Sequence, residues 1–124
     1  MVYTLDTNAI LYYLKDDPNT VSSLRNIFAQ DVPLYVSAIT ELELFAFSNL
    51  SATEEALIED LLGTVAVISV DSHIARLAAF IRRQYQLKVP DSVIAATALF
   101  TGSTLLTRNT HDFRRILNLN LLKV

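Results

Sequence analysis

Short apolar runs alternate with segments of helical periodicity along the chain, and this alternation is what most constrains its fold. The strand-like runs are expected at 2–5, 34–37, 65–70, 103–107 and about 120–123. Strands that alternate with helices form a layered fold around a mainly parallel sheet. We therefore expect a three-layer α/β/α sandwich with a central, mainly parallel five-stranded sheet. The run at 65–70 is continuously apolar, as in a strand covered on both faces.

Helical segments lie between these runs. The first begins near Asn8, and others are expected at about 40–50, 53–62, 72–85 and 93–101. The segment at 72–85 has an apolar stripe on one face and arginines on the other, a pattern typical of a surface helix. The segment at 93–101, opened by Pro90 and Asp91, is apolar almost all round. It must therefore be largely buried.

The composition favours one ordered domain over residues 1–124. Hydrophobic residues make up 52% of the chain, enough for a sizeable core, and no linker-like stretch is present. No apolar run is long enough for a membrane span, and no leader pattern precedes the first strand. The absence of cysteine excludes disulfides and thiolate zinc sites and is compatible with the cytoplasm. His73 and His111 are isolated, so a histidine-rich zinc site is not expected.

Charge is distributed unevenly along the chain. Residues 1–75 hold eleven acidic and two basic side chains, for a net charge of −9, whereas residues 76–124 have a net charge of +6. The only acids in the second part are Asp91 and Asp112. Carboxylates among arginines suit a metal site beside a phosphate-binding surface. Solvated salt bridges explain the same pattern at least as well.

Four acidic residues are candidates for such a site. Asp6 ends the first strand, Asp91 lies at the mouth of the buried helix, and Asp112 follows the fourth strand. Glu43 lies one turn inside the helix after the second strand and is long enough to reach the same edge. In parallel sheets, ligands gather beyond the carboxyl ends of the strands. The sequence therefore predicts that the four carboxylates meet there.

Each acid also has a simpler explanation. Asp6 and Asp91 are suited to cap helices, and Asp112 to bond its own loop backbone. Glu43 competes with Glu41, which points to nearly the opposite face of the same helix. Residue type alone leaves these alternatives open.

Four motifs in order resemble those of the PIN-domain family, and within it the VapC-type ribonuclease toxins. They are LDTNAIL at 5–11, TELEL at 40–44, VPDSVIAATAL at 89–99 and LLTRNTHDF at 105–113. The resemblance covers essentially the whole chain. It implies that the catalytic, metal-binding acids are Asp6, Glu43, Asp91 and Asp112, and that the supporting polar residues are Asn8, Thr107 and Asn109.

Two features depart from the family pattern. Many relatives have a glycine where this chain has Phe47, and the end after the fifth strand is short. The fourth acid is the family's most variable, so Asn109 is an alternative to Asp112 for that role.

The acid set and the resemblance together imply a chemistry. Carboxylates without Cys or paired His select Mg²⁺ or Mn²⁺ over zinc or copper. The resemblance implies an endoribonuclease that leaves a 5′-phosphate, acting as the toxin of a type II toxin–antitoxin pair. Its partners are then RNA, a cognate antitoxin and a second copy of the chain in a homodimer. We expect phosphate contacts from the arginines of the basic part, Arg82, Arg83, Arg114 and Arg115.

Two further readings come from other classes of protein. A receiver-like signalling module needs adjacent acids after the first strand, where LDTN supplies one. An interaction protein without catalysis does not need all four acids.

The apolar residues of the 40–50 helix are either all core or partly exposed at a homodimer or antitoxin interface; they are Leu42, Leu44, Phe45, Phe47 and Leu50.

Overall fold

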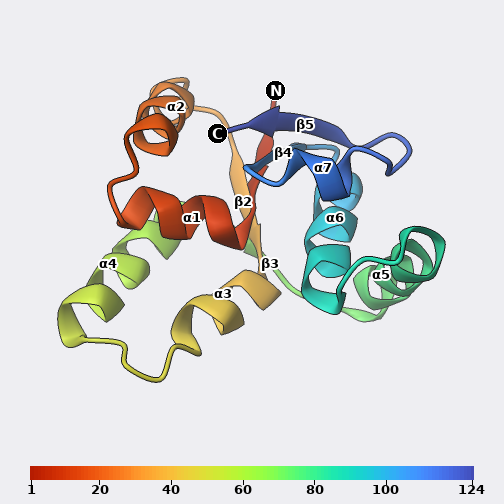
Figure 1. The fold of residues 1–124 in the computed structure, drawn as a ribbon, viewed down its shortest axis with the longest axis horizontal. Helices are drawn as coiled ribbons and strands as arrows, with labels where there is room; N and C mark the ends of the chain where they lie inside the picture. The colour runs from red at the N-terminus through yellow and green to blue at the C-terminus, as the bar shows by residue number, and fades with distance from the viewer.

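The computed structural model describes residues 1–124 and contains one five-stranded sheet (Figure 1). Its strands are β1 (Tyr3–Leu5), β2 (Leu34–Ser37), β3 (Ala66–Ile68), β4 (Thr104–Thr107) and β5 (Asn120–Lys123). They lie in the order β3-β2-β1-β4-β5, and every neighbouring pair is parallel. The expected α/β architecture is confirmed.

Helices cover both faces of this sheet. They are α1 (Thr7–Leu14), α2 (Pro18–Phe28), α3 (Ala38–Phe45), α4 (Ala52–Leu62), α5 (Ser72–Tyr85), α6 (Val89–Thr101) and α7 (Thr110–Phe113). Figure 1 shows α1, α2 and α4 on one side and α5 and α6 on the other. Each side has its own core of 12 buried residues. Every residue from Ser92 to Ala98 is buried, as predicted for α6. None of the helices combines the length and apolar character that a membrane crossing requires.

The central strand β1 positions the first acid. It pairs with β2 on one side and β4 on the other, although β4 lies about one hundred residues further along the chain. The backbone N–H of Asp6 continues this pairing by donating to the Leu106 carbonyl over 3.1 Å. Asp6 therefore lies at the carboxyl edge of the sheet, between its two central strands.

The expectation for residues 65–70 was wrong in two respects. The strand has only three residues, and it forms the edge of the sheet, with Ala66 and Val67 exposed. An edge strand has a neighbour on one side only, and its apolar run here is not covered on both faces.

Two helices also differ from the sequence prediction. The helix expected to reach residue 50 ends at Phe45 with Ala46 as its C-cap, and the next helix is capped separately by Ser51, whose hydroxyl accepts from the Glu54 N–H. No element was predicted where α2 lies. The sequence feature that marks the start of α2 is Asp17 followed by Pro18. In the structure Asp17 caps the helix and accepts from the Thr20 N–H over 3.1 Å.

Candidate metal centre

Asp6 is a helix cap and a buried site residue at the same time. It is the N-cap of α1 and accepts from the Asn8 backbone N–H over 3.3 Å. Its second oxygen accepts from the Thr107 hydroxyl over 2.7 Å. Burial raises the pKa of Asp6, and the bond from Thr107 opposes that rise. Asp6 therefore caps α1 and is bonded to the end of β4 at the same time.

Glu43 is held toward Asp6 by a pair of threonine hydroxyls. Thr7, the residue after Asp6, lies 2.8 Å from Glu43 Oε1 and 2.9 Å from the Thr40 hydroxyl. Both threonines are buried. Glu41 makes no such bond, so the structure brings Glu43 to the edge where Asp6 lies. The sequence prediction did not include Thr7 or Thr40 as supporting residues. Their positions could have indicated this role, because Thr7 directly follows Asp6 and Thr40 lies one turn before Glu43.

Asp91 lies in the first turn of α6, but it does not cap the helix. The N-cap is Lys88, and no side chain bonds to the helix start. No hydrogen bond in the structure reaches the Asp91 carboxylate. Burial, together with the charges of Asp6, Glu43 and Asp112, raises its pKa to about 6. The structure thus brings Asp6, Glu43 and Asp112 within electrostatic reach of Asp91.

Asp112 is attached to this group through Asn109. It lies in the short helix α7, not in a loop as expected, and Asn109 is the cap of that helix. The Asn109 amide donates to Asp112 Oδ2 over 2.7 Å, and the Asn109 backbone N–H donates to the Thr107 hydroxyl over 2.9 Å. One chain of bonds therefore runs from Asp112 through Asn109 and Thr107 to Asp6. The Asn8 side chain is exposed, and only its backbone N–H takes part.

The donor set fits a hard divalent cation. It consists of carboxylate oxygens without cysteine, the set that Mg²⁺ and Mn²⁺ prefer. In this structure no three of the acids stand in metal-ligating geometry. Carboxylates without a counter-ion repel one another, and three of these four are held by hydroxyl or amide donors. Both Asp91 oxygens remain free of such bonds.

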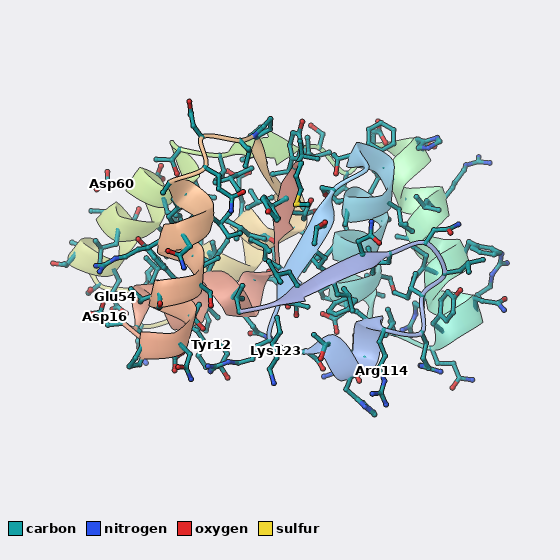
Figure 2. All side chains as sticks on the ribbon, turned by 90° about the horizontal axis from the view of Figure 1, so that it is seen from above. Tyr12, Asp16, Glu54, Asp60, Arg114 and Lys123 are labelled. Carbon is teal, nitrogen blue, oxygen red and sulfur yellow. The ribbon has the colours of Figure 1, made fainter.

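The four predicted phosphate-binding arginines fall into two pairs. Arg82 donates to the Leu87 carbonyl and Arg115 to the Tyr85 carbonyl over 2.8 Å, so both stabilise the end of α5. Arg83 and Arg114 are exposed and make no hydrogen bond or ion pair with the protein. In Figure 2, Arg114 lies along the same edge of the molecule as Tyr12 and Lys123.

Comparison with known proteins identifies the family. The PIN-domain model matches residues 3–118, and the chain therefore belongs to the PIN-domain family. Two curated relatives bear the name VapC. The chain is 28% identical to the tRNA(fMet)-specific endonuclease VapC of Shigella flexneri, over 92% of this chain and 91% of that protein. It is 30% identical to Ribonuclease VapC2 of Haemophilus influenzae, over 94% of this chain and 93% of that protein.

Solved structures agree with this membership. The toxin–antitoxin complex from Klebsiella pneumoniae superimposes with a TM-score of 0.81 at 28% identity, covering 97% of this chain and 95% of that one. VapBC-1 from nontypeable Haemophilus influenzae superimposes with a TM-score of 0.80 at 27% identity, covering 99% of this chain and 98% of that one. VapBC2 from Rickettsia felis, at 23% identity and full coverage of this chain and 99% of that one, shares the fold with a TM-score of 0.85.

Proposed function

We propose that this chain is an Mg²⁺- or Mn²⁺-dependent endoribonuclease and the toxin of a type II toxin–antitoxin pair. The observation that carries the proposal is the group of four acids at the carboxyl edge of the sheet, in which Asp6, Glu43 and Asp112 all raise the pKa of Asp91. Such a group is costly to maintain without a cation. The ribonuclease names of the VapC relatives support RNA as the substrate.

In this proposal the acids Asp6, Glu43, Asp91 and Asp112 hold the cation. When bound, the ion supplies Lewis-acid activation of water and neutralises charge on the phosphate oxygens. The surrounding residues fix the acids before substrate arrives. Thr107 orients Asp6, Thr7 orients Glu43, and Asn109 orients Asp112. Such preorganisation spares the acids from reordering when the phosphodiester binds.

The first test removes one charge at a time from the acid group. Asp6→Asn and Asp91→Asn should each abolish Mg²⁺-dependent cleavage of RNA, because an amide is a much poorer ligand for a hard cation. Circular dichroism checks that each variant is folded. The matched control is Asp60→Asn, an exposed acid on α4 far from this edge (Figure 2). Full cleavage by a folded Asp91→Asn protein would contradict the metal centre.

The proposed second partner is an antitoxin protein. An apolar hollow of about 340 Å³ lies between α1 and the start of α4, and none of the four acids lines it. Phe47 and Leu57 line it with side chains 51% and 47% exposed. A surface of this kind suits an apolar segment of a partner. The Klebsiella pneumoniae toxin–antitoxin complex supports a partner of that class.

Co-expression with a candidate cognate antitoxin tests this partner. Wild type should co-purify with that protein, and Phe47→Asp should not, because a charge in the hollow opposes apolar contact. Leu117→Asp is the control, since Leu117 is 74% exposed and lies outside the hollow. Equal co-purification of both variants would exclude the hollow as the docking surface.

A further inference from the structure

A second hollow of the structure is lined mainly by residues with hydrogen-bond donors. Its lining residues are Asn19, Ser23, Arg108, Lys123 and Val124, and we call it the β4–β5 hollow. Asn19 and Ser23 are four residues apart on α2, so they share one face of that helix. An amide, a hydroxyl, a guanidinium and an ammonium thus surround it, and all four donate to anionic oxygens.

Arg108 is fixed in place before any ligand binds. Its guanidinium donates to Asp17 Oδ2 over 2.9 Å, in the only salt bridge of the structure. It also lies 4.2 Å from the centroid of the Tyr12 ring, in a cation–π contact. One N–H group is used in these bonds, and an arginine has five. A preorganised guanidinium with free donors loses little entropy when it binds a phosphate.

Lys123 supplies a second positive charge to the hollow. It forms no ion pair, whereas the charge of Asp17 balances that of Arg108. The Thr20 backbone N–H holds the pKa of Asp17 below its usual value, so Asp17 stays ionised. The Lys123 ammonium therefore remains available to an anionic ligand.

The hollow adjoins the metal centre. Lys123 on β5 pairs in register with Thr107 on β4, and paired residues of parallel strands point to the same face. Thr107 is the residue whose hydroxyl bonds to Asp6, and Arg108 is its neighbour in the chain. In Figure 2, Lys123 lies between Tyr12 and Arg114 along this edge. An RNA strand that is cleaved at the acids and continues past Thr107 would reach the hollow next.

We propose that the β4–β5 hollow binds a backbone phosphate of the RNA strand, adjacent to the phosphate that is cleaved. The inference rests on the proposed ribonuclease function. Guanidinium and ammonium groups over a shallow polar surface suit a phosphodiester, whose non-bridging oxygens accept several bonds at once. The hollow contributes affinity and register, not base selection, because a backbone phosphate is the same in every nucleotide.

The test measures binding of a short single-stranded RNA in EDTA, so that the strand stays intact. Lys123→Gln should weaken binding about fivefold at about 0.1 M salt and reduce the slope of log K against log salt by about 0.7, the value for one phosphate contact on a single strand. With Mg²⁺, the loss should appear in KM more than in kcat. The matched control is Arg25→Gln, which removes the same charge from α2 outside the hollow and should leave the salt slope unchanged.

A second arm replaces one RNA phosphate at a time with a neutral methylphosphonate. One position beside the cleaved bond should weaken wild-type binding and leave binding by Lys123→Gln unchanged, which identifies the phosphate that the hollow holds. If Lys123→Gln and Arg25→Gln weaken RNA binding equally, the effect comes from the overall positive charge of the protein and not from the hollow. That result would overturn the proposal. If Lys123→Gln affects only binding of a partner protein, the hollow is a protein-docking surface and the proposal fails. Wild type that neither binds nor cleaves RNA would instead refute the proposed function itself.

Discussion

Thr107 is the residue on which the geometry of the acids depends most. Its hydroxyl accepts the Asn109 backbone N–H and donates to Asp6, so it links the end of β4 to the end of β1. The family resemblance predicted Thr107 and Asn109 as supporting residues. It did not predict which acid each one holds, because Thr107 and Asp6 are 101 residues apart and their bond depends on strand order.

Replacing Thr107 with valine tests this link. The substitution keeps the shape but removes the hydroxyl, which leaves a buried oxygen of Asp6 without its donor. We expect a loss of about 1–3 kcal/mol in the free energy of unfolding and a lower cleavage rate. Urea denaturation and a cleavage assay measure the two effects. In the control Thr101→Val, the lost hydroxyl bonds only within α6 and to Ser103, so cleavage should persist.

The raised pKa of Asp91 predicts a dependence of stability on pH. The pKa of about 6 in the folded state exceeds the ordinary aspartate value of 3.8, so the folded state holds this proton more tightly. The resulting stabilisation is full below about pH 4 and is lost as the pH rises through about 6. At about pH 7.5 in EDTA, Asp91→Asn should therefore be more stable than wild type by about 1–2 kcal/mol, after allowance for solvent screening.

Urea denaturation at about pH 4 and about pH 7.5 separates this effect from simple repacking. The difference between Asp91→Asn and wild type should vanish at the lower pH, where both side chains are neutral. A difference that persists unchanged at both values would rule out charge repulsion as its cause.

At the scale of elements, the sequence predicted best where a local signal determines the structure. The β2 and β5 runs and the buried α6 were confirmed, because their apolar patterns are strong. The extent of the 65–70 run was not predictable, since edge and central strands are distinguished by strand order. The α2 helix was missed although the Asp17 cap and Pro18 mark its start.

The cap of α3 links an element boundary to the acid group through Glu43. The Ser37 hydroxyl accepts from the Ile39 N–H over 3.1 Å, at the start of the helix that carries Glu43. Ser37→Ala should cost about 1 kcal/mol of stability and also lower kcat, because α3 then holds Glu43 less firmly. Thermal denaturation and steady-state cleavage measure both.

The control is Ser51→Ala, which removes a cap from α4, a helix that carries none of the four acids. It should lower the melting temperature without changing kcat. A fall in kcat of the same size in both variants would show that general instability, not the position of Glu43, is responsible.

For the molecule as a whole, cation binding and folding should be coupled. The acids come from four separate segments that only the folded sheet brings together. The proposed cation should therefore stabilise the folded state, by about 2.7 kcal/mol at a concentration about one hundred times its Kd. For a chain of this size we expect Mg²⁺ to raise the melting temperature by about 10 °C.

Differential scanning fluorimetry with and without Mg²⁺ measures this shift, and EDTA should reverse it. Asp91→Asn should lose most of the shift, while Asp60→Asn should retain it. An Mg²⁺ shift that is equal in both variants would mean that the ion binds elsewhere.

The order of the strands also has a consequence for synthesis. The β1 strand is among the first segments to leave the ribosome, but its neighbour β4, which carries Thr107, is translated about one hundred residues later. Until then Asp6 lacks its donor and the central pairing of the sheet does not exist. Contacts between such distant segments also form slowly. In the proposed ribonuclease, the acid group is therefore incomplete for most of the chain's own translation.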